Sequence, residues 1–293
     1  MDDQTRPYRS VLYIPGSRER ALEKAKSLPV DAIIFDLEDA VAADEKKNAR
    51  DLLAQTLSDG GYGSRVQLIR INGFDTEWGS ADFEEIAKIE PQVFLLPKVG
   101  SADDIAAVAS KLDGLPGCDH TKIWAMIETP QGVLNAAEIA AAPRMGGFVL
   151  GTNDLSKELM TKFRADREPL LMSLQLCVLA ARAAGITVVD GVYNAFKDAE
   201  GLRFECEQGR DMGFDGKSLI HPAQVSIANE VFGPAPEDLA LAQKQIHAFE
   251  EAVANGQGVA VVDGRIVENL HVATAKALLA KANAIAELEA NSA

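Results

Sequence analysis

Two carboxylates follow apolar runs in the middle of the chain. Residues 123–127 form one run that ends at Glu128, and residues 148–150 form another that leads through a Gly-Thr-Asn turn to Asp154. In a parallel sheet such positions lie at the C-terminal ends of the strands, where (β/α)₈ barrels carry their catalytic groups. Two carboxylates from neighbouring strands offer the oxygen ligands that Mg²⁺ prefers. The alternative is that each acid only caps the helix that follows it.

A second charged group lies earlier in the chain. Asp36, Glu38 and Asp39 follow the second apolar run, and Arg70 lies in an apolar run at residues 66–71. A buried guanidinium needs a partner, and its planar fork fits a carboxylate through two parallel hydrogen bonds. Two interpretations stay open. Arg70 either forms a structural ion pair with one of these acids, or it also grips a carboxylate or thioester oxygen of a substrate.

Basic residues gather around the end of the first apolar run. That run ends at Pro15 and Gly16, and Arg18 and Lys24 follow. Backbone N–H groups at a helix start, together with these cations, suit a phosphate group. The alternative role for this segment is structural, with Ser17 as the N-cap of the helix.

Other chemistry is less well supported by the sequence. Lys98 ends the fourth apolar run, and we expect it to pair with the nearby acids rather than to form a Schiff base. The four histidines show no metal-ligand spacing, so a zinc site is not expected. The chain has no Gly-x-Ser-x-Gly elbow and no Gly-x-Gly-x-x-Gly after its first strand, which disfavours a Ser-His-Asp hydrolase and a dinucleotide fold.

Eight apolar runs alternate with stretches of helical pattern such as residues 42–57 and 101–112. This alternation predicts a parallel sheet, and eight strands can close into a barrel filled by side chains. We therefore predict a (β/α)₈ TIM barrel of α/β class in residues 1–222. The expected strands are residues 10–14, 32–35, 66–71, 93–96, 123–127, 148–150, 187–189 and 216–220, the last being the weakest.

The remaining residues, 223–293, are predicted to form a C-terminal helical extension. A helical stretch is followed by a Gly-Pro-Ala-Pro break, a second helix at 237–254, a short apolar run at 259–262 and a last helix from about Asn269. Eight units already complete a barrel. We expect the extension to cover a barrel mouth, meaning the C-terminal ends of the strands, or to reach a partner subunit, and we favour an arrangement in which it covers the active site of a neighbouring subunit.

Composition limits the function further. The chain has 293 residues, of which 47% are hydrophobic, and its 29 Lys+Arg against 44 Asp+Glu give a net charge of −15. Such an acidic chain is a poor candidate for nonspecific binding to nucleic acid or to a membrane surface. No apolar run reaches ~18 residues and the first residues are polar, so neither a membrane span nor a secretory signal is expected. The odd number of cysteines, 3, favours a reducing, cytoplasmic location without disulfides.

Seven segments together resemble the citrate lyase β-subunit-like family of CoA-ester enzymes, which contains citryl-, citramalyl- and malyl-CoA lyases and a malyl-CoA thioesterase. The resemblance runs in order over nearly the whole chain. The segments are Arg-Ser-Val-Leu-Tyr-Ile-Pro-Gly at 9–16, Phe-Asp-Leu-Glu-Asp-Ala-Val at 35–41, Ile-Arg-Ile-Asn at 69–72, Leu-Pro-Lys at 96–98, Ile-Glu-Thr-Pro at 127–130, Gly-Thr-Asn-Asp-Leu at 151–155 and Gly-Lys-Ser-Leu-Ile-His-Pro at 216–222.

The resemblance implies a metal site and a cationic centre. Mg²⁺, with Mn²⁺ as the alternative, would be held by Glu128 and Asp154, and Arg70 would contact the reacting carbonyl. The acids implied to orient Arg70 and the metal-bound waters are Asp36, Glu38 and Asp39.

The resemblance also implies a CoA site and an assembly. CoA would lie near the end of the first strand, and the protein would be a homotrimer or a pair of trimers (a hexamer) with active sites shared between subunits. The residues implied to bind CoA are Pro15, Gly16, Arg18 and Lys24.

The C-terminal segment departs from the family pattern. The family has Asp-Gly-Lys-Met-Ile-Asp, whose last acid acts as acid or base in a neighbouring subunit, whereas residues 263–268 here are Asp-Gly-Arg-Ile-Val-Glu. Glu268 is one methylene longer, and a displacement of ~1 Å in a reacting group can cost about 100-fold in rate. Glu268 could instead direct a water at a thioester while Arg70 stabilises the oxyanion. Residues 190–194 also resemble the thioesterase branch more than the citryl branch.

We therefore expect Mg²⁺-dependent hydrolysis of a short 3-hydroxy-dicarboxyl-CoA thioester, (3S)-malyl-CoA, to malate and CoA, with Arg70, Glu268 and Asp36 as catalytic residues. The alternative is a malyl-CoA or citramalyl-CoA lyase that releases acetyl-CoA and a 2-oxo acid. A further alternative is a subunit of a citrate lyase complex that acts on an acyl-carrier partner.

Overall fold

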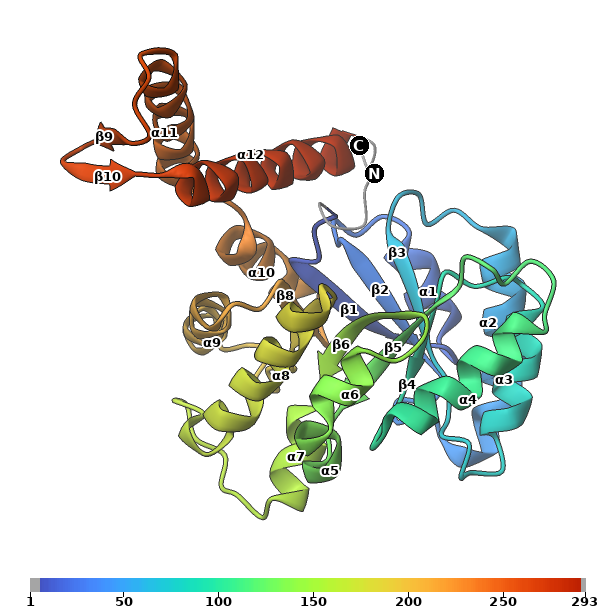
Figure 1. Cartoon of the computed structure of the whole chain (residues 1–293). Coiled ribbons are helices and arrows are strands. Elements are labelled where there is room, and N and C mark those ends of the chain that lie inside the picture. Colours follow the sequence, from blue (N-terminus) through green and yellow to red (C-terminus); the bar gives the residue numbers. More distant parts are fainter. Residues whose placement is uncertain (1–5, 291–293) are drawn as a thin grey trace.

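The computed structural model describes residues 6–290 (Figure 1). Eight parallel strands close into a barrel in the order β1 to β8, so the predicted (β/α)₈ fold is confirmed. The N-terminal residues 1–4, on which the expectation of no secretory signal rested, lie outside the described residues. The strands are β1 (Ser10–Pro15), β2 (Ala32–Asp36), β3 (Val66–Arg70), β4 (Val93–Leu96), β5 (Lys122–Ile127), β6 (Met145–Leu150), β7 (Thr187–Asp190) and β8 (Gly216–Leu219).

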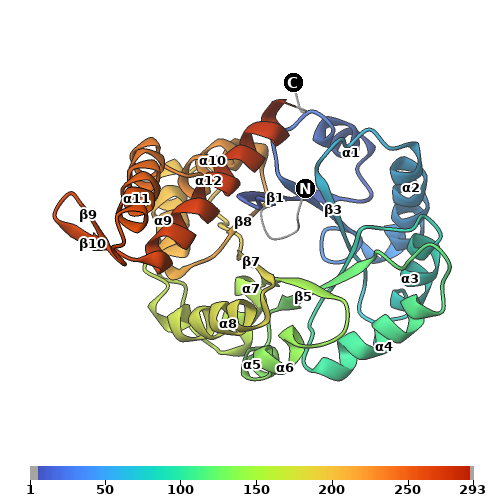
Figure 2. The ribbon, with the colours of Figure 1, turned by 45° about the horizontal axis from the view of Figure 1, so that its top comes forward.

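Helices form a ring around the strands (Figure 2). Local sequence explains several of their ends: Ser101 and Asp104, for example, form a capping box at the start of α4. The helices of the barrel are α1 (Glu19–Ala25), η1 (Ala43–Glu45), α2 (Lys46–Asp59), α3 (Gly79–Ala87), α4 (Ala102–Asp113), α5 (Pro130–Leu134), α6 (Ala136–Ala140), α7 (Thr152–Glu158), η2 (Glu168–Leu170), α8 (Leu171–Ala184), α9 (Ala199–Met212), η3 (Pro222–Gln224) and α10 (Val225–Phe232).

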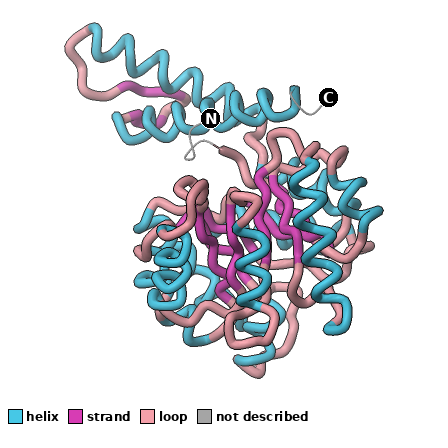
Figure 3. Tube along the Cα trace, turned by 90° about the vertical axis from the view of Figure 1, so that its right-hand side faces the viewer, coloured by secondary structure: helices cyan, strands magenta, loops and turns pink. Residues whose placement is uncertain are grey.

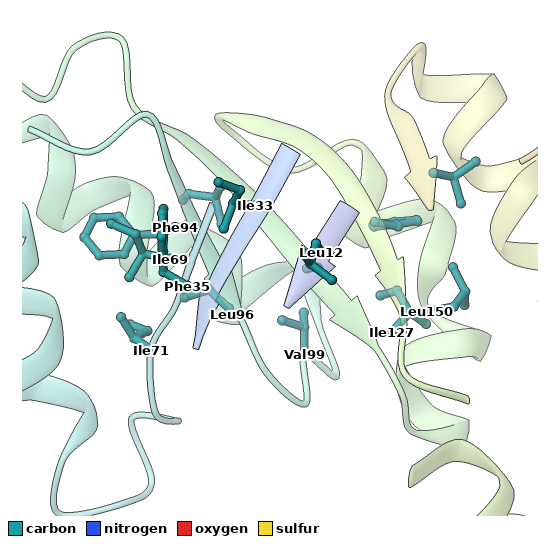
Figure 4. Close-up of a cluster of buried hydrophobic side chains, with 14 of the residues drawn as sticks. Leu12, Ile33, Phe35, Ile69, Ile71, Phe94, Leu96, Val99, Ile127 and Leu150 are labelled. Atoms are coloured by element: carbon teal, nitrogen blue, oxygen red, sulfur yellow. The ribbon is translucent and has the colours of Figure 1, made fainter. Parts of the chain in front are cut away.

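The core has two layers, one inside the barrel and one between the barrel and its helices. In β2, Ala32 and Ile34 belong to the inner layer, and Ile33 and Phe35 to the outer one, part of which Figure 4 shows. Strands that are buried on both faces produce continuous apolar runs rather than alternating ones. This is why the sequence revealed them so clearly.

Helix α10 packs against the barrel, because its apolar residues belong to the outer core layer. The packing of the barrel therefore continues past residue 222 to Phe232. After it come α11 (Pro236–Ala254), an antiparallel hairpin of β9 (Ala260–Val262) and β10 (Arg265–Val267), and α12 (Asn269–Ala290). This extension has a small core of its own, formed by Ala252, Ala260, Val267 and Val272.

The extension lies at the N-terminal ends of the strands, opposite the mouth. Figures 1 and 3 show it beyond one end of the barrel, and in Figure 1 α5 and α7, which begin at the mouth, lie at the other end. Arg9, just before β1, pairs with Glu289 near the end of α12 at 3.1 Å. The extension therefore lies away from the mouth of its own chain, and its covering of a neighbouring subunit's site stays a prediction. The physical reason is that α10 runs back along the barrel, so the chain leaves it at the far end.

The described residues also bear on membrane-spanning helices and on the cysteines. Between residues 6 and 290, no helix is both long and apolar enough to cross a membrane. Cys118, Cys177 and Cys206 are buried and carry free thiols.

Candidate active site

A cavity of about 290 Å³ opens at the mouth of the barrel. The side chains of five of the predicted site residues line it together, although they come from segments far apart in the sequence. These are Asp36, Asp39, Arg70, Glu128 and Asp154. The parallel barrel brings them together because each lies at or just after the C-terminal end of its strand.

Arg70, the last residue of β3, is the cationic centre of this cavity. Its Nε and Nη2 atoms donate to the two carboxylate oxygens of Asp36 at 2.7 and 2.5 Å, and its Nη1 lies 2.7 Å from Glu38 Oε2. Asp39 is more distant, at 3.6 Å, and its side chain is largely exposed. The predicted ion pair is therefore present, and it involves two buried acids rather than one.

The surroundings of Arg70 keep it charged and fixed. Burial is the largest single effect and disfavours the charged form, but Asp36, Tyr13 and Glu38 together outweigh it and hold the pKa of Arg70 well above its usual value. The ring of Tyr13 lies 5.1 Å from the guanidinium carbon, and Nη1 also contacts the sulfur of Met126 at 3.4 Å. The carboxylates bind the nitrogens along the edges of the guanidinium, and the Tyr13 ring lies over its plane. A guanidinium held in this way can present its charge without reorganising.

The acidic segment after β2 is held by a buried lysine that the sequence did not single out. Lys46 in α2 donates to the carbonyl oxygens of Leu37 and Glu38 at 2.9 and 2.7 Å, and to Asn72 Oδ1 at 2.8 Å. Asp36 in turn accepts the backbone N–H of Glu38 at 2.9 Å. These bonds fix the direction from which both acids approach Arg70.

Glu128 lies directly after β5 and is 1% exposed. Its Oε1 accepts the backbone N–H of Lys98 at 2.7 Å. The helix-capping alternative does not apply to it, because Thr129 is the residue that caps α5, by accepting the N–H of Gly132 at 3.0 Å. Glu128 is thus a buried carboxylate that faces the cavity without a structural role in the next helix.

Asp154 lies in the first turn of α7, and no side-chain hydrogen bond caps that helix. Glu128 and Asp154 are close enough that the charge of Asp154 contributes to raising the pKa of Glu128. Among residues 6–290, no three or more His, Cys, Asp or Glu side chains are arranged to hold a metal. The two carboxylates fit Mg²⁺, because that ion commonly takes one or two protein carboxylates and fills its other positions with water or substrate oxygens.

Burial is the main cause that raises the pKa of Glu128 from 4.5 to about 7. Between those values the folded protein binds more protons than the unfolded one, so its free energy of unfolding falls as pH rises through this window. In metal-free buffer, we expect the Tm of the wild-type protein to fall between pH 5 and 8 by up to about 6 °C more than the Tm of the Glu128→Gln variant. Thermal melts of both proteins across this range measure the difference, and parallel curves would contradict it.

Gly151, at the start of α7, leaves room for Glu128. A Cβ atom at position 151 would lie 2.3 Å from Glu128 Oε2 and 2.4 Å from its Cβ. Gly151→Ala must therefore displace this carboxylate, and a shift of ~1 Å at a reacting centre can cost about 100-fold in rate. We expect that loss in kcat, whereas the matched variant Gly114→Ala, whose added Cβ would have Lys111 O as its nearest neighbour at 3.6 Å, should keep wild-type turnover. Equal kcat in both variants would refute the prediction.

Two other residues at the mouth have structural partners. Lys98 Nζ lies 3.4 Å from Glu38 Oε1, which confirms the expected ion pair. His221 stacks on Phe196, with 4.6 Å between ring centroids, and its Nδ1 accepts the N–H of Ala223.

The expected phosphate site at the first helix is only partly supported. The N–H of Gly16 donates to Asp36 O at 2.8 Å and that of Arg18 to Pro15 O at 3.1 Å, so neither amide is free for an anion. Ser17 is not the N-cap, because α1 begins at Glu19 with Arg18 in the cap position. The exposed side chains of Arg18 and Lys24 remain the groups that could meet a phosphate, and they lie outside the cavity.

Glu268 is not part of the cavity of its own chain. It follows β10 in the extension, is exposed, and its backbone N–H donates to His271 Nδ1 at 3.0 Å. Because α12 continues from there to the N-terminal ends of the strands, Glu268 lies away from the mouth of its own chain.

Comparison with known proteins decides the family. The model of the HpcH/HpaI aldolase/citrate lyase family matches residues 9–222. The chain belongs to this family. The citrate lyase subunit beta of Escherichia coli (strain K12) is 32% identical over 95% of this chain and 94% of that protein. This similarity confirms the resemblance to citrate lyase β subunits that the sequence motifs indicated.

A closer relative is the protein named (3S)-malyl-CoA thioesterase of Cereibacter sphaeroides, which is 62% identical over 99% of this chain and 100% of its own length. Among solved structures, the protein CitE from Mycobacterium tuberculosis in complex with magnesium, acetoacetate and coenzyme A gives a TM-score of 0.79 at 29% identity. The alignment covers 95% of this chain and 99% of that one.

Sequence reasoning missed Tyr13 and Met126, which line the cavity and contact Arg70. The alternation of side chains along a strand could have identified both residues as inward-facing. Tyr13 is two residues after Val11, and Met126 two after Trp124, and all four belong to the inner layer of the barrel. Residues near the C-terminal end of a strand on this inward face point toward the mouth.

Proposed function

We propose that this protein is a Mg²⁺-dependent thioesterase that hydrolyses (3S)-malyl-CoA to malate and CoA. The observation that carries the proposal is the 62% identity to the (3S)-malyl-CoA thioesterase of Cereibacter sphaeroides over 99% of the chain. The cavity contains groups suited to this reaction, because the guanidinium of Arg70 and the carboxylates of Glu128 and Asp154 lie together at the mouth of the barrel. A short dicarboxyl thioester offers the carboxylate, hydroxyl and carbonyl oxygens that such groups bind.

The substrate would bind between the carboxylates and Arg70. We assign Glu128 and Asp154 as the metal ligands, as the donor set and the magnesium-bound CitE structure suggest. When bound, Mg²⁺ would orient and polarise the carboxylate and hydroxyl oxygens of the acyl group. Arg70, held by Asp36 and Glu38, would bind the thioester carbonyl oxygen.

Hydrolysis then needs a water, a base and an oxyanion partner. The water oxygen attacks the thioester carbon while Glu268 accepts its proton, and Arg70 stabilises the negative charge that develops on the carbonyl oxygen. The C–S bond breaks, the CoA thiolate leaves, and Glu268 can return the proton to it. The exposed Arg18 and Lys24 would meet CoA phosphates outside the cavity.

Glu268 would have to come from a second copy of the chain. The extension carries exposed apolar side chains around the hairpin, namely Val261, Ile266 and Leu270. Contiguous exposed apolar groups of this kind are typical of interaction sites. We propose a homotrimer, or a hexamer built from two trimers, in which the hairpin of one subunit covers the mouth of the next.

Product analysis tests the reaction. Purified protein incubated with (3S)-malyl-CoA and Mg²⁺ should release malate and free thiol in equal amounts. Asp154→Asn serves as the control and should abolish the Mg²⁺-dependent rate while keeping the fold by circular dichroism. Release of glyoxylate and acetyl-CoA instead would refute hydrolysis.

Carbon–carbon cleavage remains the second candidate function, because relatives of 32% identity are citrate lyase subunits. A lyase must return a proton to the enolate carbon of acetyl-CoA rather than direct a water at the thioester. Turnover of free CoA esters by the isolated protein would count against a role restricted to an acyl-carrier complex.

A further inference from the structure

Four buried charged side chains lie behind strands β7 and β8, outside the cavity. Lys217 and Asp190 come from the strands themselves and are fully buried. Lys217 Nζ donates to Asp190 Oδ2 at 3.0 Å and to Glu205 Oε1 at 2.7 Å, and Arg167 Nη1 donates to both oxygens of Asp190 at 2.7 and 2.8 Å. The charges balance, and none of the four lines the cavity or has a part in the proposed chemistry.

Stability alone does not explain a buried set of this kind, because well-packed apolar residues can often replace it without loss. Arg167 also donates to Gln208 Oε1 at 2.7 Å and to the carbonyl oxygen of Glu205 at 3.4 Å, both in α9. Two further bonds go to the segment that follows β7. Lys217 Nζ donates to the carbonyl oxygen of Gly191 at 2.7 Å, and the N–H of Gly191 donates to Asp190 Oδ1 at 2.8 Å. Both backbone groups of Gly191 are thus fixed from the buried side.

A buried glutamine holds the next residues. Gln224 is 1% exposed, and its Nε2 donates to the carbonyl oxygen of Tyr193 at 2.9 Å. Its Oε1 accepts the backbone N–H groups of Ile220 and His221 at 2.9 and 3.1 Å. One side chain therefore ties the segment after β7 to the segment after β8.

The residues held in this way form the apolar side of the mouth. Val192 lies between Gly191 and Tyr193, and both Val192 and Ile220 line the cavity. Gly191 itself packs closely on α7, since a Cβ there would lie 2.4 Å from Thr152 Oγ1. Small movements of this segment would therefore change the shape of the cavity.

We infer that Lys217 and Gln224 are positioning residues that hold Val192 and Ile220 as an apolar wall, and that this wall selects the acyl group. The inference rests on the proposed function. With Arg70 bound to the carbonyl oxygen, and the carboxylate and hydroxyl oxygens bound to the Mg²⁺ that Glu128 and Asp154 would hold, the remaining substituent on the hydroxyl-bearing carbon would face the wall. A hydrogen fits there, and a methyl group is disfavoured.

The test compares (3S)-malyl-CoA with the same ester carrying a methyl group on the hydroxyl-bearing carbon. Gln224→Glu keeps the shape and the acceptor oxygen but places a carboxylate oxygen against the carbonyl of Tyr193. Gln175→Glu is the matched control, because Gln175 also donates to a backbone carbonyl, that of Met212 at 3.3 Å, on the exposed face of α8. A second test variant is Lys217→Met, which removes the bond to Gly191.

One extra methyl in such a pocket changes kcat/KM by about 10- to 200-fold, so wild type should prefer malyl-CoA by at least about 10-fold. We expect Gln224→Glu and Lys217→Met to lower this preference at least about 5-fold, mainly through KM, and Gln175→Glu to keep it. If Lys217→Met does not fold, Gln224→Glu decides alone.

Each contrary outcome has its own meaning. A folded Gln224→Glu variant with the wild-type preference, or a wild-type enzyme that hydrolyses both esters equally, would refute the apolar wall and leave the proposed function intact. A wild-type protein that hydrolyses neither ester would refute the proposed function, and this inference with it.

Discussion

Arg70→Lys is expected to lower kcat on malyl-CoA by about 100- to 1,000-fold, the loss typical of removing one oxyanion-stabilising donor. The lysine keeps a positive charge against the buried Asp36 and Glu38, so the fold should survive. It loses the planar fork that bonds both oxygens of Asp36 while a third nitrogen faces Glu38. Steady-state kinetics at saturating substrate measure the effect.

Arg9→Lys is the matched control. Arg9 also bonds both oxygens of a buried aspartate, with Nε 3.0 Å from Asp31 Oδ2 and Nη2 2.9 Å from Oδ1, but it lies at the opposite end of the barrel. It should lose stability without losing kcat. Similar kcat values for the two variants would show that Arg70 has only a structural role.

Glu268→Gln should lose about 100- to 10,000-fold in turnover, as expected when a general base is removed. Binding of the CoA ester should persist, because Glu268 lies outside the cavity that holds the other groups. Isothermal titration with a non-hydrolysable ester and a turnover assay separate the two effects. Weakened binding with unchanged kcat would contradict the role of Glu268 as a base.

Mixing this variant with Asp154→Asn tests whether sites are shared. A site with a wild-type mouth from one chain and a wild-type hairpin from another would form in about a quarter of positions of a random 1:1 mixture, because the two halves are drawn independently. We expect roughly that fraction of wild-type activity after subunit exchange. No recovery in mixed oligomers verified by native mass spectrometry would place each site within a single chain.

The barrel was predictable because most strands are buried on both faces, which leaves a largely apolar run for each of them. Strand β3 is interrupted by Gln67, and β6 and β8 depart further from this pattern. Strand β6 begins at Met145 rather than at 148, because Gly146 and Gly147 carry no side chain. They lie under the ring of Trp124, where a Cβ on Gly146 would meet its Nε1 at 2.6 Å. Strand β8 looked weak because it carries Lys217, whose burial depends on acids from distant segments.

The candidate site was predictable where its residues lie at strand ends, and less so elsewhere. Asp36, Arg70 and Glu128 converge because the barrel brings all strand ends to one rim. Lys46 and Gln224 act through backbone carbonyls that lie 9 and 31 residues away along the chain, and no local pattern marks such bonds. The position of Glu268 depended on the direction in which the chain leaves α10, which is a property of packing rather than of composition.

Because the chain leaves the barrel at the end opposite the mouth, the proposed assembly requires the acid-bearing hairpin to serve a neighbour and not its own subunit. Under the proposed assembly, dilution would dissociate the subunits. Each barrel would still bind the ester but would lack the Glu268 that a neighbouring subunit provides. The rate per molecule would then fall along with the total rate, and the cellular abundance of the protein would govern how fast each copy works as well as how many copies there are.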